Sequence, residues 1–398
     1  MRNATEKWVW RVGFLACLSL GWSNAGRGQT APGVTEKEIV IGSCAALEGP
    51  SRFLGRETVA GAEAYFRMVN EEGGVHGRKL KLVSFDDNYD PEKAQGCWDK
   101  LMADKPFALG FFVGTPTAVK YVPLAEKNQI PIVGLFTGAQ TLYAPLRHWV
   151  INVRASYFDE TRAQVDGLWK NLHYRKIGII YPDDPFGSAV LAGVEAALTA
   201  NGGAPVASAS YQRQTNETSG AIDKVREANP DAVIVVGPSN TVAPIVKQAH
   251  AKGWKPLFVT VSFVGTDDLI QQAGDDSDGM VITQVVPPYY LTDLKTVALY
   301  RRTMQKYAPD SKPNFVSLEG FVDAMVLVEG LKRAGKDLTR EGLVHGIESI
   351  HDWDAGLGPD LKVDYSTKDH KGFKHVIPTV VRGGRAVPFT DWAIVPKK

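Results

Sequence analysis

Short apolar segments alternate with helix-like segments through most of the chain, and this alternation restricts the possible folds more than any other feature. Residues 232–236 read Ala-Val-Ile-Val-Val, without the polar alternation of a half-exposed strand, so we expect this strand to be buried on both faces of a sheet. Strands that are connected by single helices pair in parallel, because the crossover returns the chain to the same end of the sheet. The sequence therefore predicts an α/β fold.

The expected strands form two series, and helices follow them. The first series comprises residues 38–44, 80–86, 108–113 and 131–136, and the second comprises residues 176–181, 206–211, 232–236, 257–261 and 279–285. Helices are then expected at residues 293–306, 315–334 and 339–350, with a last strand at residues 375–382. A chain of 398 residues exceeds what one hydrophobic core usually organises. We therefore expect two doubly wound parallel-sheet lobes.

The N-terminus has the pattern of a secretory signal peptide. A basic start that includes Arg11 precedes the mostly apolar residues 12–22, and small residues follow as far as Ala25. The apolar run is about half of the roughly 20 residues that a membrane-spanning helix needs. We interpret residues 1–25 as a signal peptide cleaved near Ala25, which predicts a periplasmic protein. An alternative makes Cys17 the lipid-modified first residue of a lipoprotein.

Composition and motifs argue against nucleic-acid binding and catalysis. The net charge of +1 gives no basic excess that would attract nucleic acid. Asp86, Asn88 and Asp90 match the first spacings of a calcium loop, but Pro91 and Cys97 stand where that loop needs Gly and Glu. The eight histidines lack zinc-ligand spacing, and the nucleotide-binding and nucleophile-elbow motifs are missing. We therefore expect no catalytic residues, no metal and no cofactor.

The stretch from residue 73 to residue 91 reads as a helix end, a turn, a strand and a new helix start. Gly73 and Gly74 permit the positive φ that ends a helix, and Asp90 can cap a helix that begins at Pro91. This stretch closely resembles the first lobe of leucine/isoleucine/valine-type periplasmic binding proteins. The order of elements extends the resemblance over nearly the whole mature chain.

That resemblance implies a type I periplasmic-binding fold, in which the chain crosses between two lobes three times. It implies that lobe 1 comprises residues 36–155 and 287–354, and that lobe 2 comprises residues 156–286 and 355–398. It also implies a monomer that captures a small solute in an interlobe cleft, without enzymatic activity, and delivers it to the membrane permease and ATPase subunits of an ABC importer of the branched-chain amino acid class. The alternative is a ligand-sensing receptor module for a signalling partner.

In open parallel sheets, ligands bind beyond the carboxyl ends of the strands, so the loops at those ends are the candidate site. Gly114 and Thr115 open a helix whose free N–H groups suit an anion such as a carboxylate. A Thr helix cap alone would explain the same residue types. The match to the family's carboxylate-binding loop favours ligand binding.

Three further candidates in lobe 1 and at the first crossing come from the same comparison. Phe136 and Thr137 resemble the segment that contacts the bound amino acid in this family, although a turn before the next helix would explain them equally well. Tyr157 stands at the first crossing, where it could close over a ligand or serve as hinge packing.

Lobe 2 supplies Ser239 and Ser262 as candidates, and it departs from the family pattern. Amino-acid binders carry a carboxylate near Ser262 that pairs with the ligand's ammonium group, whereas this chain has no acid there before Asp267. A buried ammonium group without a counter-charge is costly. An uncharged or acidic solute, such as an aromatic or short-chain carboxylate, therefore fits better, unless Glu48 or Asp184 supplies the missing charge.

Two cysteines remain in the mature chain, Cys44 and Cys97. An oxidising compartment permits a disulfide between them, and two buried thiols are the alternative.

Overall fold

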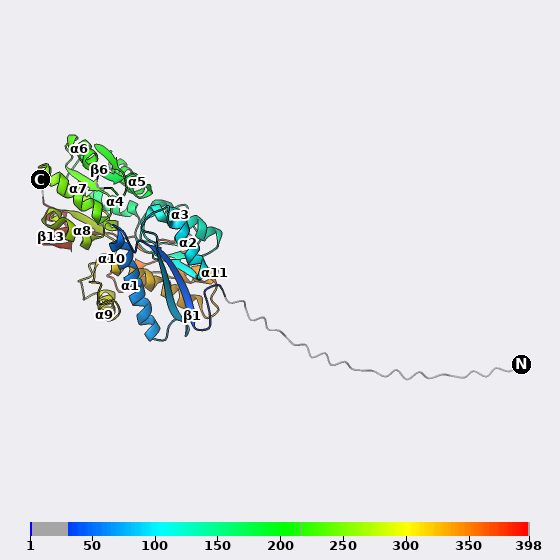
Figure 1. Cartoon of the computed structure of the whole chain (residues 1–398). Helices are drawn as coiled ribbons and strands as arrows, with labels where there is room; N and C mark the ends of the chain where they lie inside the picture. Colours follow the sequence, from blue (N-terminus) through cyan, green and yellow to red (C-terminus); the bar gives the residue numbers. More distant parts are fainter. Residues whose placement is uncertain (2–30, 216, 397–398) are drawn as a thin grey trace.

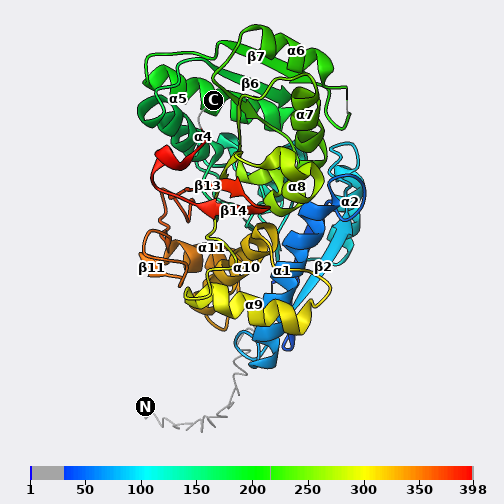
Figure 2. The same ribbon diagram turned by 90° about the vertical axis from the view of Figure 1, so that its left-hand side faces the viewer.

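The computed structural model describes residues 1, 31–215 and 217–396 (Figure 1). Apart from Met1, the predicted signal peptide lies outside the described residues, and so does Cys17 of the lipoprotein alternative. Among the described residues, no helix has the length and apolar character needed to cross a bilayer. The two sheets belong to two lobes, which lie one above the other in Figure 2.

The first lobe contains a five-stranded sheet in which every pair of neighbouring strands is parallel. Its strands, in spatial order, are β2 (Lys79–Asp86), β1 (Glu38–Ala45), β3 (Ala108–Gly110), β4 (Ile132–Val133) and β5 (Val150–Ile151). Its helices are α1 (Arg52–Glu71), α2 (Ala94–Ala103), α3 (Thr115–Lys127), α9 (Lys295–Tyr307), α10 (Phe315–Ala334) and α11 (Arg340–Glu348). Ile132 and Val133 belong to two different apolar clusters, so both faces of the sheet are covered.

Strands β3 and β4 are shorter than the predicted strands at residues 108–113 and 131–136. Phe111 and Gly134 have φ values of 64° and 68°, which turn the backbone out of the extended conformation. Pairing resumes at the bridge between Val113 and Phe136. The apolar sequence of these segments reports burial correctly, but it does not reveal the backbone turn.

The second lobe contains a seven-stranded sheet that is mostly parallel. Its strands, in spatial order, are β14 (Arg385–Pro388), β13 (Ile377–Arg382), β10 (Val281–Gln284), β9 (Leu257–Thr260), β8 (Ala232–Val235), β6 (Ile177–Pro182) and β7 (Ala207–Tyr211). Its helices are α4 (Tyr157–Asp166), α5 (Pro185–Ala200), α6 (Ser219–Glu227), α7 (Ser239–Ala251) and α8 (Thr266–Ala273). The predicted parallel-sheet lobe is confirmed, and the structure adds one feature that the sequence did not reveal: strand β13 pairs antiparallel with β10 and β14 at one edge. A strand that enters last and returns through a hairpin needs no crossover helix.

The segment at residues 355–373 packs with the first lobe, although it was expected in lobe 2. Strands β11 (Trp353–Asp354) and β12 (Lys362–Val363) form a small hairpin, and Leu357, Val363 and Phe373 lie in the same apolar cluster as the α10 side chains. The N–H of Phe373 also donates to the carbonyl of Val153. We therefore propose that the third crossing lies after Phe373 and not near residue 355.

Helices α1 and α10 touch through their backbones. A Cβ atom on Gly61 would lie 1.9 Å from the carbonyl oxygen of Ser317, and one on Gly320 would lie 2.1 Å from that of Thr58. Neither position therefore has room for a side chain. This contact fixes the helix pair that covers one face of the first sheet.

A disulfide joins Cys44 at the end of β1 to Cys97 in α2, with 6.2 Å between the two Cα atoms. Of the two alternatives that the sequence left open, the structure forms the disulfide. Cys44 lies at the carboxyl end of the strand that leads into the first loop of the cleft. The bond therefore anchors that loop to α2.

Removal of this disulfide should destabilise the protein without changing its fold. The bond joins two residues that are 53 positions apart in sequence. In the chain-entropy model, closing a loop of this size raises the free energy of unfolding by about 4 kcal/mol. Denaturant unfolding of a Cys44→Ser, Cys97→Ser double variant should show this loss. Wild-type protein treated with reductant should match the double variant, and equal midpoints for oxidised and reduced wild type would contradict the expectation.

Candidate ligand-binding cleft

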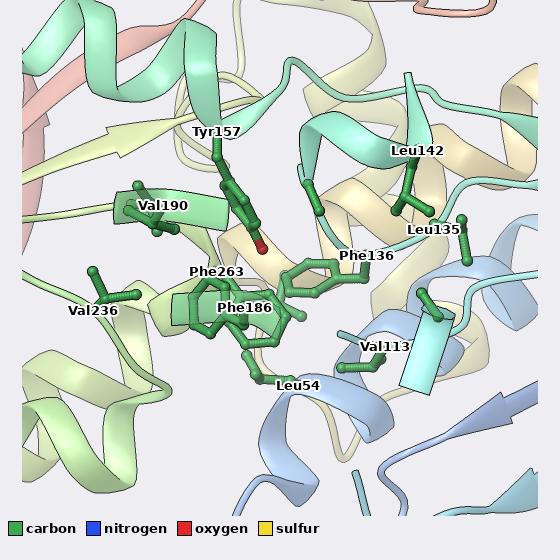
Figure 3. Close-up of a cluster of buried hydrophobic side chains, with 14 of the residues drawn as sticks. Leu54, Val113, Leu135, Phe136, Leu142, Tyr157, Phe186, Val190, Val236 and Phe263 are labelled. Carbon is green, nitrogen blue, oxygen red and sulfur yellow. The ribbon is translucent and has the colours of Figure 1, made fainter. Parts of the chain in front are cut away.

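Aromatic side chains from both lobes meet where the lobes face each other (Figure 3). Phe136 follows β4 in the first lobe, while Phe186 and Phe263 come from α5 and the turn after β9 in the second. The ring of Phe263 lies 5.6 Å from that of Phe136 and 4.5 Å from that of Phe186. Tyr157 adds its ring 5.3 Å from Phe186. These four residues are fully or almost fully buried, and we call them the aromatic cluster.

A chain of hydroxyl groups lies beside the aromatic cluster. The Oγ1 atoms of Thr115 and Thr137 are 2.7 Å apart, and Tyr157 Oη lies 3.3 Å from Thr137 Oγ1. Gly114 is the N-cap residue of α3 and has a φ of 89°, which permits the turn from the strand into the helix. Five predicted site residues therefore lie together: Gly114, Thr115, Phe136, Thr137 and Tyr157.

This arrangement suits a carboxylate or another small anion. The first N–H groups of α3 lack partners within the helix, and the helix dipole adds partial positive charge there. Thr115 and Thr137 are buried, so their hydroxyl groups exchange few hydrogen bonds with water. Burial also raises the pKa of Tyr157, whose phenol therefore remains a neutral hydrogen-bond donor.

Arg154 occupies the first crossing between the lobes and is fully buried. Its guanidinium group forms ion pairs with Glu160 of α4 at 2.8 Å and with Glu319 of α10 at 3.0 Å. It also donates to Ser262 Oγ, and it lies 5.5 Å from the centre of the Phe136 ring. The charged group thus contacts both lobes and one member of the aromatic cluster.

Two carboxyl groups near Arg154 hold protons more tightly than usual. Burial raises the pKa of Glu319 to about 7; the charge of Glu160 contributes to this shift and Arg154 opposes it. Burial, together with the charge of Glu319, raises the pKa of Asp323 well above its usual range. Asp323 Oδ2 is buried without a hydrogen-bond partner, which fits a protonated carboxyl.

The two lobe 2 candidates bind protein groups in this structure. Ser262 Oγ accepts from Arg154 and donates to Glu160, whose other carboxylate oxygen accepts from the Ser262 N–H at 2.8 Å. Ser239 Oγ donates to Asp268 of α8. Ser262 therefore lies close to the cluster through Arg154, whereas the Ser239 side chain is engaged away from Thr115. Both roles in ligand binding stay predictions.

Several residues at the cleft were not among the predicted site residues. Phe186 and Arg154 carry no motif, because their importance depends on contacts between segments far apart in sequence. A small cavity of about 10 Å³ lies at the edge of the cleft and is lined by residues of both lobes, including Tyr89 and Arg213. Little free space therefore remains between the lobes at this point.

The comparisons with known proteins identify the family and support the fold. The family model described as periplasmic binding protein matches residues 38–385. The chain belongs to the periplasmic binding protein family. Its lobes confirm the predicted type I fold, and the family as a whole binds solutes and is not enzymatic.

Relatives within the family carry amino-acid-binding names. An amino acid binding protein of Pseudomonas aeruginosa is 24% identical over 359 residues, which span 86% of this chain and 93% of that protein. A Leu/Ile/Val-binding protein of Escherichia coli is 22% identical over 273 residues, or 67% of this chain and 71% of that protein. The crystal structure of a possible leucine/isoleucine/valine-binding protein from Rhodopirellula baltica has a TM-score of 0.86 and 30% identity, and the match covers 90% of this chain and 98% of that one.

The ionisation of Glu319 should make stability depend on pH. The folded state holds this proton between pH values of about 4.5 and 7, where the unfolded carboxyl has released it, so the stabilising contribution falls as pH rises through that window. Glutamine cannot ionise. The unfolding free energy of wild type minus that of Glu319→Gln should therefore decrease by up to about 3 kcal/mol from pH 4.5 to pH 7.5.

Denaturant unfolding at a series of pH values measures this difference. Glu329→Gln is the matched control, because Glu329 lies on the same helix and pairs with Arg333 at a partly exposed position. The control should show no comparable change across the window. A pH-independent difference for Glu319→Gln would contradict the expectation.

Proposed function

We propose that this protein is an exported solute-binding protein that captures a small organic acid in the interlobe cleft for an ABC importer. The observation that supports the ligand class most directly is the pairing of an aromatic cluster with the hydroxyl chain at the start of α3. The cluster suits an aromatic or branched aliphatic body, and the hydroxyl groups with the helix N-terminus suit a carboxylate.

The charges around the cleft disfavour a free α-amino acid. Phe263 occupies the loop where amino-acid binders of the family were expected to carry an acid, and it packs among aromatic rings. Three acids near the cleft, including the alternatives Glu48 and Asp184, already have cationic partners. These ion pairs are Glu48–Arg56 at 2.6 Å, Asp184–Arg213 at 3.0 Å and Glu160–Arg154 at 2.8 Å.

Two partners are compatible with this fold. The family works with ABC transporter components, which supports delivery to a membrane permease and its ATPase. A sensory module for a signalling partner is the alternative. Ligand uptake measured in cells that lack this protein distinguishes the two hypotheses. Loss of uptake supports the importer, and unchanged uptake supports the sensor.

Calorimetric titration should show binding of carboxylates in preference to amino acids. We expect 4-methylpentanoate or benzoate to bind, whereas leucine and valine bind poorly or not at all, because an ammonium group would be buried without a free counter-charge. Leucine and 4-methylpentanoate differ only in the amine, so this pair isolates the charge. Submicromolar binding of leucine would overturn the ligand class and leave the family assignment intact.

The Thr115→Val variant should bind the same carboxylate more weakly by about 1–3 kcal/mol, the cost of a lost hydrogen bond to a charged group. Valine keeps the shape of threonine, so the fold should persist. Thr303→Val is a suitable control, since Thr303 is a buried threonine in α9 whose hydroxyl donates to the carbonyl of Leu299. Equal affinities for both variants would return Thr115 to the role of a structural helix-start residue.

A further inference from the structure

Tyr89 has a buried hydroxyl group that none of the described residues satisfies. The residue is 3% exposed, and its Oη atom forms no hydrogen bond within residues 31–215 and 217–396. Burial is also the main reason that its pKa lies well above the usual value, so the phenol stays protonated and able to donate. A buried polar group normally has a partner, because leaving it unpaired is unfavourable.

The Tyr89 ring lies directly against the start of α3. A Cβ atom on Gly114 would lie 2.0 Å from Cε2 and 3.0 Å from Cζ of that ring. The phenol end of the side chain is therefore next to the N-cap of α3, a 13-residue helix whose first residue is Thr115. Only glycine at position 114 leaves room for this contact.

The loop that carries Tyr89 is held in an uncommon backbone conformation. Asn88 and Tyr89 have φ values of 55° and 54°, in the left-handed region that few residues other than glycine adopt. The buried carboxylate of Asp87 accepts from the Tyr89 N–H at 2.9 Å and from the Tyr121 hydroxyl at 2.9 Å. Such conformations persist where surrounding contacts enforce them, and they are frequent at ligand-binding sites.

Residues of the second lobe also contact Tyr89. Arg213 donates to the Tyr89 carbonyl at 2.8 Å, and its guanidinium group lies 4.8 Å from the centre of the Tyr89 ring. Gln214 donates to the same carbonyl at 3.3 Å, and the Phe263 ring lies 5.8 Å from the Tyr89 ring. These contacts join Tyr89 of the first lobe to residues of the second lobe.

We propose that Tyr89 is a ligand-binding residue whose hydroxyl donates to the carboxylate of the bound solute at the start of α3. This inference rests on the proposed function, and it assigns to the anion-binding end a donor that lies beyond the hydroxyl chain of Thr115, Thr137 and Tyr157. The solute supplies the partner that Oη lacks. Because Arg213 belongs to the opposite lobe, its hydrogen bond to the Tyr89 carbonyl couples the position of this donor to the arrangement of the lobes.

Tyr89→Phe tests the assignment because it removes one oxygen atom and keeps the ring. Calorimetric titration with benzoate and 4-methylpentanoate should show affinity reduced by about 10-fold to 100-fold, the range for a lost hydrogen bond to a charged group. The reduction should be smaller for benzamide and 4-methylpentanamide, which lack the charge. The melting temperature of the ligand-free variant should equal or exceed that of wild type, since an unpaired buried hydroxyl has been removed.

Tyr174→Phe provides the matched control. Tyr174 Oη is also buried without a partner, and Tyr174 lies in the second lobe, just before β6 and outside the aromatic cluster. This variant should bind both carboxylates within twofold of wild type.

Three results would overturn the inference. Unchanged carboxylate affinity in Tyr89→Phe would show that Oη does not contact the solute, while wild-type binding would still support the proposed function. A melting temperature several degrees below that of wild type would show that the hydroxyl serves the fold. If wild type binds neither carboxylate, the inference and the proposed ligand class both fail.

Discussion

The burial of Arg154 is the constraint on which the arrangement of the lobes depends. A guanidinium group cannot lose its proton under ordinary conditions, so its removal from water must be offset by partners, here Glu160 from one lobe and Glu319 from the other. Loss of either partner would leave an uncompensated buried charge, which typically costs about 3–5 kcal/mol. The ion pairs therefore fix where the first crossing sits, and with it the start of α4 and the position of Tyr157.

The aromatic cluster extends this connection into a shared hydrophobic core. One apolar cluster includes Ile132 of the first sheet and Ile234 of the second, and Phe136 and Phe263 lie in the same cluster. The contact between the lobes thus buries apolar surface as well as paired charges. Under the proposed function, a solute in the cleft would replace some of these contacts, and its binding energy would then favour the closed arrangement of the lobes.

Much of the fold could be predicted from the sequence, because long apolar segments and helix caps are local signals. Helix α10 was predicted with its observed bounds, whereas β3 ends earlier than predicted because the backbone turn at Phe111 leaves no trace in the hydrophobicity of the sequence. In the candidate cleft, Thr115 and Thr137 could both be predicted because each follows the end of a strand, and the structure places their hydroxyl groups 2.7 Å apart. Sequence reasoning missed Arg154 and Tyr89, since each has a partner that lies more than 100 residues away in sequence, namely Glu319 and Arg213.

The glycine contact between α1 and α10 separates the parts of this protein that can be redesigned from those that cannot. At Gly61 and Gly320 even one added carbon would strike a backbone atom of the opposing helix, so the frame tolerates no change there. The cleft is different, because Phe136 after β4, Phe186 in α5 and Phe263 in the turn after β9 come from separate elements and contact one another through their side chains. An engineer who wants to change the ligand preference of this scaffold should therefore vary these three rings and leave Gly61 and Gly320 unaltered.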